Sequence, residues 1–298
     1  MSQIITKADE IDFSIDDLPV MPQPNRVLMV KPTYFDVEYV INPHMKGFIG
    51  GVDKMQAQNE WEHLADAFRE FGYKVIIIDG QRNLPDMVFS ANQSLPFIDE
   101  DGSLKAVMGI MQSDERKDEV PHIETALQAL GYETVHLEKD SVSEFEGMGD
   151  AIWHFQRKLL WGGYGFRTSS EAYRQISGLF DIPVVALELT DDYFYHLDTC
   201  FCSLNETSVL IYPQAFTEEG LEIIHKLYPT VIEATTYEAK SQFAVNAACP
   251  DGRNVLIQQG CTDINRKLRN HGFKVHEFST YEFIKSGGSV FCMKLMLW

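Results

Sequence analysis

The sequence lacks a run of the roughly 18 to 20 apolar residues that a bilayer-spanning helix needs, and no hydrophobic signal segment opens the chain. Basic residues are scarce, because 25 Lys and Arg stand against 44 Asp and Glu, for a formal net charge of -19. Neither a nucleic acid nor a membrane is therefore expected as a partner, since both favour a basic surface. We expect a cytoplasmic protein that acts on a small molecule, and the sequence leaves homo-oligomer formation open.

Cysteine is also sparse, and its number of five is odd, which argues against a secreted disulfide framework. Cys200 and Cys202 form a C-x-C pattern whose alternation predicts both side chains on one face of a strand. No second cysteine pair or histidine pair completes a zinc set. No G-x-G-x-x-G fingerprint follows a predicted strand, because GGYGF at 162–166 has a different spacing. We therefore expect neither a metal nor a cofactor, and we disfavour a dinucleotide-binding fold.

What is present indicates one globular domain with a short N-terminal arm. The 298 residues are 45% hydrophobic and 12% aromatic, which suffices for a large core. Residues 1–25 are acidic, contain proline and show weak periodicity, so we expect an arm that lies on the surface or is partly disordered. Residues 26–298 are expected to form a single domain that begins with a strand over 26–30.

One theme recurs along that domain. A helical stretch ends at a Gly or Pro break, and a short β-branched strand follows, as expected for a helix C-terminus that leads into a buried strand. This unit recurs with a period of roughly 45 to 60 residues, which indicates a repeat architecture. The predicted helix and strand pairs are 52–71 with 72–79, 119–130 with 131–138, 170–180 with 181–189, 218–228 with 229–235, and 263–271 with 272–278.

Hairpin patterns lie between these units, and they complete the predicted fold. The first unit lacks a hairpin partner of its own, and a terminal strand over 290–297 could supply it by pairing with 26–30, which closes a ring. The sequence therefore predicts an α/β fold, a five-bladed propeller with pseudo-fivefold symmetry built from ββαβ repeats. The predicted hairpins join 89–97 to 104–109, 151–155 to 159–162, 199–204 to 208–213, and 243–248 to 254–259.

A cysteine near the C-terminus is the strongest candidate for chemistry. Residues 286–295 read SGGSVFCMKL, in which Gly287 and Gly288 open a turn and an apolar run carries Cys292. Glycines let a ligand or another chain segment come close, so we expect Cys292 just inside a strand beside an open corner. The alternative is a buried structural cysteine, which is a common fate of a free thiol.

Polar residues also stand where a core strand would not favour them. Asp86 and Asn92 flank an apolar run, and Glu146 and Asp150 bracket two glycines before a predicted strand. Each has an alternative role as a turn or cap residue. A further pair, His196 with Asp198, is two positions apart and is expected on one face of a strand.

Together these residue types suit one kind of reaction. A guanidinium is planar and cationic, so an enzyme that attacks it needs carboxylates to hold its N–H groups and a thiolate to add to its carbon. A histidine near the leaving nitrogen must protonate the departing ammonia and then deprotonate a water. The sequence supplies these groups from several different predicted repeats.

The motifs HLDTCF, FEGMGD, PDMVFSAN and SGGSVFC resemble those of the guanidino-group-modifying enzymes, the pentein superfamily. That superfamily includes arginine deiminases, dimethylarginine dimethylaminohydrolases and amidinotransferases. The stretches YFDVEYVINPHM, VFSAN, GGYGFRT, FYHLDTCF and YPQAF are most similar to the cyanobacterial-type arginine dihydrolases, which convert arginine to ornithine, carbon dioxide and ammonia. The resemblance runs from about residue 26 to the end, and it implies the five-bladed α/β propeller of the penteins.

The resemblance also implies roles for individual residues. Cys292 would be the nucleophile and His196 the general acid and base. The guanidinium would be bound by Glu146 and Asp86 and oriented by Asp198, with Asp150 as the alternative to Glu146. The rest of the substrate would be held by Arg116 and Arg167, which would clamp its α-carboxylate, and by Asn42 and Asn92.

Asn92 separates the possible activities, because the deiminases and dimethylargininases carry a second aspartate at this place. An amide both donates and accepts hydrogen bonds, so it can retain a neutral ureido intermediate for a second attack by Cys292. The expected function is therefore an arginine dihydrolase. One alternative is the same site stopping at citrulline, as in an arginine deiminase or a dimethylargininase-type hydrolase that accepts a methylated or otherwise altered guanidine, or transferring the amidino group to an amine. The other alternative is a non-catalytic pentein that serves as a binding scaffold. A scaffold does not need the candidate site residues, and the acidic charge disfavours an RNA partner.

Overall fold

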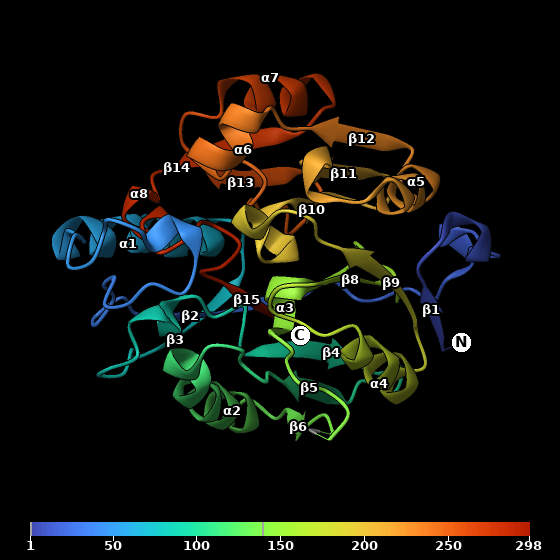
Figure 1. The fold of residues 1–298 in the computed structure, drawn as a ribbon, viewed down its shortest axis with the longest axis horizontal. Coiled ribbons are helices and arrows are strands. Elements are labelled where there is room, and N and C mark those ends of the chain that lie inside the picture. Colours follow the sequence, from blue (N-terminus) through green and yellow to red (C-terminus); the bar gives the residue numbers. More distant parts are fainter. Residues whose placement is uncertain (1, 139) are drawn as a thin grey trace.

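The computed structural model describes residues 2–138 and 140–298, and in this part of the chain the strands form five separate sheets. The sheets surround a common centre, and a helix lies outside each of them, as Figure 1 shows. Each sheet contains a strand, here called the middle strand, that pairs in parallel with a strand farther out, here called the outer strand, and one sheet consists of this pair alone. The middle and outer strands are β2 (Arg26–Val30) with β3 (Lys74–Ile78), β5 (Leu104–Met108) with β6 (Glu133–Val135), β8 (Leu160–Tyr164) with β9 (Pro183–Glu188), β11 (Ser208–Ile211) with β12 (Thr230–Glu233), and β13 (Asn254–Gln258) with β14 (Lys274–Phe278).

Each parallel pair is joined by a helix, which is the crossover that parallel strands require. The predicted helix and strand pairs are all confirmed, and so is the α/β propeller of ββαβ units. The crossover helices are α1 (Lys54–Glu70), α2 (Val120–Ala129), α4 (Glu171–Phe180), α5 (Glu218–Leu227) and α7 (Thr262–Asn270).

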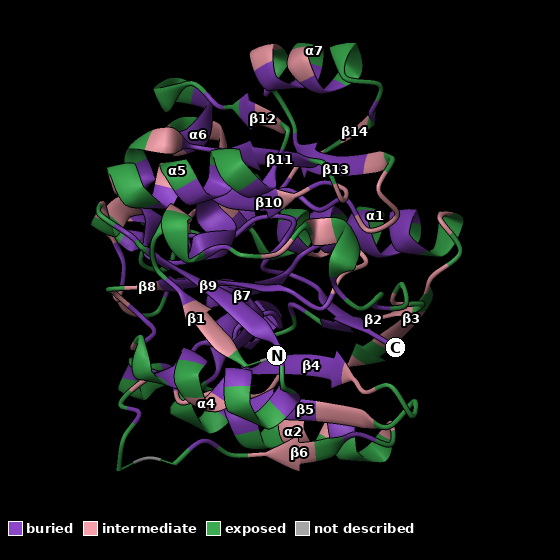
Figure 2. Ribbon diagram, turned by 90° about the vertical axis from the view of Figure 1, so that its right-hand side faces the viewer, coloured by how far each residue is buried: buried purple, intermediate pink, exposed green. Residues whose placement is uncertain are grey.

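Helix α5 illustrates why these segments fold as they do. The Thr217 hydroxyl accepts a hydrogen bond from the Gly220 N–H at 3.1 Å and so caps its first turn. Ile223, Ile224 and Leu227 are buried on one side, as an amphipathic helix over a sheet requires. Figure 2 shows the result, because strands such as β8 and β9 are largely buried whereas the outer faces of the helices are exposed.

The innermost strands pair antiparallel with the middle strands. They are β4 (Ser94–Ile98), β7 (Ala151–Trp153), β10 (Phe201–Ser203) and β15 (Leu295–Leu297), and β15 pairs with β2 as predicted. The predicted strand over 290–297 is too long, because turns cover 290–293 and β15 begins only at Leu295. The predicted strand over 243–248 is also wrong, since only a bridge between Ala248 and Leu256 remains there and Phe243 is left-handed with φ 49°.

His196 and Asp198 do not lie on a strand as predicted. They belong to a 3-10 turn, in which the Thr199 N–H donates to the His196 carbonyl at 3.1 Å. Cys200 ends this turn and Cys202 lies in β10, so the two cysteines do not share a strand face. Three further short helices were not expected from the sequence: α3 (Gly147–Asp150), α6 (Thr236–Gln242) and α8 (Tyr281–Ile284).

The N-terminal arm is more ordered than its weak periodicity predicts. Strand β1 (Gln3–Ile5) pairs in parallel with β9 and adds a fourth strand to that sheet. Ile5, Leu18 and Met21 are buried in the main hydrophobic core. The apolar side chains of the arm follow no regular pattern, yet they bury area against the domain. Because there is no periodic pattern, the sequence did not predict strand β1.

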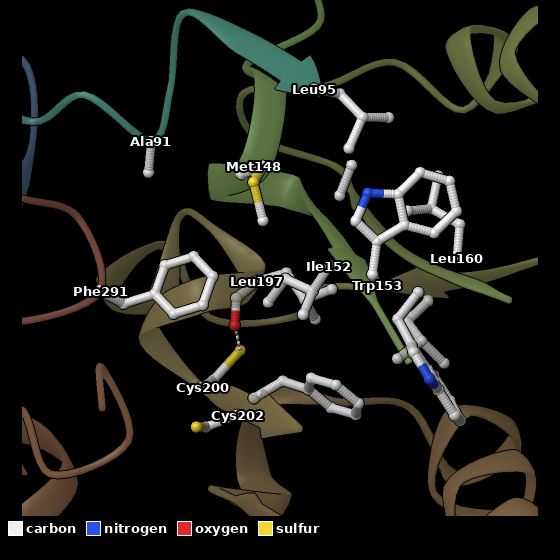
Figure 3. Close-up of a cluster of buried hydrophobic side chains, with 14 of the residues drawn as sticks. Ala91, Leu95, Met148, Ile152, Trp153, Leu160, Leu197, Cys200, Cys202 and Phe291 are labelled. Atoms are coloured by element: carbon white, nitrogen blue, oxygen red, sulfur yellow. Dashed lines mark hydrogen bonds between the residues drawn. The ribbon is translucent and has the colours of Figure 1, made fainter. Parts of the chain in front are cut away.

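The core reaches the centre of the ring. Figure 3 shows Met148, Ile152, Leu197 and Phe291 turned toward one another from segments that are far apart in the sequence. Each of these side chains is at most 6% exposed. None of the helices in residues 2–138 and 140–298 combines the length and apolarity that a bilayer crossing requires.

Candidate active site

A small cavity in the domain gathers most of the residues that the sequence singled out. Its volume is about 10 Å³, which is room for about one water molecule. An arginine side chain can therefore enter only if the surrounding side chains or loops move. The predicted residues that line it are Asn42, Asp86, Asn92, Arg116, Arg167, His196 and Cys292, and they are joined by Ile41, Phe89, Tyr195, Ser286 and Gly287. Glu146, Asp150 and Asp198, which complete the predicted set, lie directly behind this lining, where they contact His196, Leu197 and Cys292.

Cys292 lies in a turn at the cavity rather than inside a strand. Its thiol Sγ donates to the Asp198 carboxylate Oδ2 at 3.1 Å. Burial, followed by the charge of Asp198, raises the pKa of the Cys292 thiol well above its usual range. Burial also raises the pKa of Asp198 to about 7, although the hydrogen bond from Cys292 opposes this. The Cys292 thiol is therefore protonated in this arrangement, and a cation bound nearby would favour its ionisation.

Asn246 organises the turn that carries Cys292, and sequence reasoning missed it. The Asn246 Oδ1 atom accepts hydrogen bonds from the N–H groups of Ser289 and Phe291 at 3.1 Å and of Cys292 at 3.4 Å. Its Nδ2 atom donates to the Asp198 carbonyl at 3.0 Å and to the Cys292 Sγ at 3.2 Å. One buried amide thus positions the thiol and its acid neighbour together. The signal was available, because Asn246 is a polar residue in the apolar run FAVNAAC.

His196 is held by an acid that lies behind the cavity lining. Its Nε2 atom lies 2.7 Å from the Glu146 Oε2, and the Arg167 Nη1 lies 3.4 Å from the same oxygen. Burial pushes the pKa of Glu146 up, but Arg167 and the His196 hydrogen bond outweigh it and lower that pKa to about 2. Glu146 is therefore ionised, and it can stabilise a His196 imidazolium that has taken up a proton.

Asp150 does not take the place of Glu146. Its carboxylate accepts hydrogen bonds from the Thr168 hydroxyl at 2.7 Å and the Leu197 N–H at 2.9 Å, whereas the His196 Nε2 is 4.0 Å away. Burial raises the pKa of Asp150 to about 7. The geometry therefore gives Asp150 the task of fixing the 3-10 turn that presents His196, and leaves Glu146 as the acid that contacts the ring.

Asn92 lies between His196 and Arg116. Its Oδ1 atom accepts from the Arg116 Nη1 at 3.0 Å, which orients the amide so that its Nδ2 faces the His196 Nδ1 at 3.5 Å. Gly149 leaves room for this amide, since a Cβ at that position would collide with the Asn92 Nδ2. The amide is therefore fixed with its donor toward the catalytic histidine candidate.

A buried acid that the sequence did not single out holds Arg116. The Arg116 Nη2 donates to the Glu119 Oε2 at 2.8 Å and to the Asp86 carbonyl at 3.2 Å. Burial raises the pKa of Glu119 to about 7, although Arg116 lowers it. The Asp86 side chain accepts from the Ser286 hydroxyl at 2.7 Å, and burial raises its pKa. The spacing of Glu119 three residues after Arg116 was a signal for this pair.

The remaining wall is formed by Asn42, Tyr195 and Gly287. The Asn42 Nδ2 donates to the Ser286 carbonyl at 3.0 Å, and the Tyr195 hydroxyl donates to the Gly287 carbonyl at 2.6 Å. Gly287 has φ 87°, and a Cβ there would lie 2.7 Å from the Tyr195 hydroxyl. The predicted close approach at this glycine is thus confirmed. Tyr195, which the sequence analysis missed, also stacks under the Arg167 guanidinium with 4.9 Å to the ring centroid.

Comparisons with known proteins agree with this geometry. Residues 40–297 match the family described as N,N dimethylarginine dimethylhydrolase, eukaryotic. The bifunctional arginine dihydrolase/ornithine cyclodeaminase ArgZ of Synechocystis is 34% identical over 273 residues, which are 91% of this chain and 37% of ArgZ. The chain thus spans little more than a third of that relative. The N(G),N(G)-dimethylarginine dimethylaminohydrolase of Mycobacterium tuberculosis is 35% identical over 92% of this chain and 86% of its own length.

A solved structure of the N-terminal domain of ArgZ bound to substrate, an arginine dihydrolase from cyanobacteria, superposes with a TM-score of 0.84 and 33% identity. The match covers 91% of this chain and 97% of that domain. A dimethylarginine dimethylaminohydrolase structure shares the fold with a TM-score of 0.76 at 19% identity. The propeller, the gathered side chains and these matches lead to one assignment. The chain belongs to the pentein family of guanidino-group hydrolases that includes arginine dihydrolase and dimethylarginine dimethylaminohydrolase.

Proposed function

We propose that this chain is an arginine dihydrolase, which converts L-arginine and two waters to ornithine, carbon dioxide and two ammonia molecules. The observation that carries the proposal is the amide of Asn92, whose Nδ2 faces the His196 ring from 3.5 Å. A neutral amide at this place tolerates a bound ureido group better than a second carboxylate does, because it can both donate and accept hydrogen bonds. The arginine-derived intermediate is then retained for a second round of attack.

The first round removes one ammonia. The Cys292 thiolate adds to the guanidinium carbon, and His196 gives a proton to the departing amine. His196 then takes a proton from a water that attacks the thiouronium carbon, which releases the thiolate and leaves citrulline bound. The Asp198 carboxylate, 3.1 Å from the Cys292 Sγ, and the Asp86 carboxylate supply the negative charge that a guanidinium needs.

The second round repeats this chemistry on the ureido carbon. Addition of Cys292 and loss of the second ammonia leave a thiocarbamate on the sulfur. Water attack then frees an N-carboxylated ornithine, which loses carbon dioxide to give ornithine. His196 again supplies and takes the protons, since its Nε2 is hydrogen-bonded to an ionised Glu146 that stabilises the imidazolium.

A dimethylarginine hydrolase that releases citrulline is the second candidate. It is supported by the family match over residues 40–297 and by the mycobacterial relative. Both candidates use the same thiol, histidine and acids, so they differ in substrate and in the number of rounds. Asn92 favours the dihydrolase, because the dimethylargininases resemble the deiminases in carrying an aspartate there.

The decisive experiment is a product balance. The purified chain is incubated with L-arginine and, separately, with asymmetric dimethylarginine, and ornithine, citrulline, ammonia and dimethylamine are measured together. We expect one ornithine and two ammonia molecules per arginine. Release of citrulline with one ammonia would contradict the dihydrolase proposal, and preferential release of dimethylamine would favour the second candidate.

Replacing Arg167 with alanine is expected to reduce kcat/KM for agmatine, because Glu146 beside His196 loses an ion-pair partner, and to reduce it further for arginine, whose carboxylate also loses its partner. A buried guanidinium–carboxylate pair that loses one partner costs about 2 kcal/mol or more, which is about 30-fold. Arg116→Ala should act in the same direction. Arg157→Ala is the matched control, because Arg157 does not line the cavity and binds Glu206 and the carbonyl of Leu18 instead. Equal losses for both substrates would make Arg167 a structural residue.

A further inference from the structure

A second cavity lies on the other side of the segment that carries Cys292. Its volume is about 100 Å³, and it shares no lining residue with the candidate active site. The N-terminal arm, the turn after β7 and the last residues of the chain enclose it. Its walls are largely apolar and aromatic, and they include Met21, Trp153, Phe155, Phe291, Met296 and Trp298. A cavity of this size holds several waters or a small organic molecule.

One buried cation faces this apolar cavity. Lys294 lines it and is only 2% exposed. Its Nζ lies 3.2 Å from the centroid of the Phe291 ring, and within residues 2–138 and 140–298 no hydrogen bond or ion pair joins this Nζ to another group. By contrast, Lys158, the other lysine that is buried among the residues the structure describes, has a carboxylate of Glu100 at 3.8 Å. A buried ammonium without an acceptor is costly, so an anion brought to it gains a strong contact.

The neighbouring polar side chains are already satisfied. The His154 Nε2 lies 3.0 Å from the Glu206 carbonyl, and its Nδ1 accepts from the Trp161 indole at 3.3 Å. The Ser203 hydroxyl lies 2.8 Å from the Tyr228 hydroxyl. Lys294 is therefore the buried polar group that this lining leaves for a ligand, and the surrounding surface suits an apolar body.

We propose that this cavity is a second ligand site, which binds a small monocarboxylate with an apolar body through the ammonium of Lys294. One charge on the ligand matches the single cation, and a branched or aromatic body matches the walls. Burial lowers the pKa of Lys294 to about 8, while the charge of Asp198 opposes that shift. The lysine is thus protonated in most molecules at neutral pH and attracts an anion.

The site is coupled to the catalytic candidates by position. Lys294 follows Cys292 by two residues, and its charge acts on Asp198 and Cys292. A bound carboxylate neutralises that charge and weakens its support of an ionised Asp198. A carboxylate bound in this second cavity therefore changes the rate of the Cys292 reaction at neutral pH. That rate is a second quantity to measure besides binding.

The test is calorimetric titration of the whole chain with 3-methylbutanoate and with 3-methylbutanamide, which has the same shape but no charge. We expect the carboxylate to bind at least tenfold more tightly than the amide, and Lys294→Met to remove that difference. Arg167→Ala, which disables the carboxylate clamp proposed for arginine, should leave the binding unchanged. Loss of binding in Arg167→Ala, equal binding of the two ligands, or undiminished binding in Lys294→Met each overturns the proposal.

Thermal unfolding gives an independent measurement on the same variants. Lys294→Met replaces an unpaired buried cation by an apolar side chain of similar length, so its midpoint should rise. 3-Methylbutanoate should raise the midpoint of the wild type and not that of Lys294→Met. A lower midpoint for the variant would show that an internal partner already satisfies Lys294, and it would overturn the inference. None of these outcomes depends on which product the enzyme makes from arginine.

Discussion

Cys292→Ser is expected to lower turnover of the guanidino substrate by about a thousandfold or more, because serine has almost no alkoxide at neutral pH. The fold should be retained, since the hydroxyl can replace the thiol in its contacts with Asp198 and Asn246. Thermal unfolding checks the fold, and steady-state kinetics checks the loss. Cys261→Ser is the matched control, because Cys261 is buried on another blade, where its Sγ faces the Gln242 carbonyl.

A second measurement identifies the nucleophile directly. Wild-type protein quenched during turnover and examined by peptide mass spectrometry should carry a covalent adduct on Cys292. An adduct on another cysteine instead would contradict the assignment. The remaining cysteines are Cys200, Cys202, Cys249 and Cys261, and burial raises the pKa of each thiol.

Asn92→Asp is expected to change the main product from ornithine to citrulline, with a shift in their ratio of about tenfold or more. The new carboxylate loses the donor that Nδ2 presents to the neutral intermediate, and it adds a negative charge beside His196. It keeps the acceptor for Arg116, so the variant is not expected to unfold. A tenfold change in partition corresponds to about 1.4 kcal/mol, which one buried hydrogen bond can supply.

The measurement is the ratio of ornithine to citrulline for both proteins at matched turnover. Wild-type protein should also convert added citrulline to ornithine, which tests the second round in isolation. A variant that still gives ornithine, or a wild type that releases citrulline and one ammonia per arginine, would show that Asn92 does not decide the outcome. The deiminase-type reaction would then be the better description.

The regular part of the fold followed from the sequence because its causes are local. Helices such as α1 and α7 have an apolar face of period 3.6, and each ends before a glycine with φ 87°, Gly72 or Gly272. The strands after them are short, and Val and Ile make up most of the first of them, β3. Recurrence of this unit was enough to predict the propeller, since a blade can bury its apolar face only against its neighbours.

The errors over 290–297 and 243–248 fall where a side chain, rather than a neighbouring strand, bonds the backbone N–H groups. Residues 290–294 have a strand-like composition, but the Asn246 side chain takes the N–H groups that a neighbouring strand would have bonded. The segment that contains Asn246 does not form the predicted hairpin with 254–259, and only the bridge between Ala248 and Leu256 remains. Side-chain to backbone hydrogen bonds of this kind compete with a sheet, and strand propensity does not register them.

The sequence by itself determined the repeated blades, the acidic charge and the types of residue available for guanidine chemistry, since each depends on composition or on neighbours along the chain. Only the tertiary structure decided that Cys292 meets Asp198, which is 94 positions away, and that His196 meets Glu146 rather than Asp150. It alone revealed Asn246 behind the thiol and the unpaired Lys294 beside an apolar cavity. Such contacts arise when separate blades pack around one centre, and no local pattern encodes which buried groups are left without a partner.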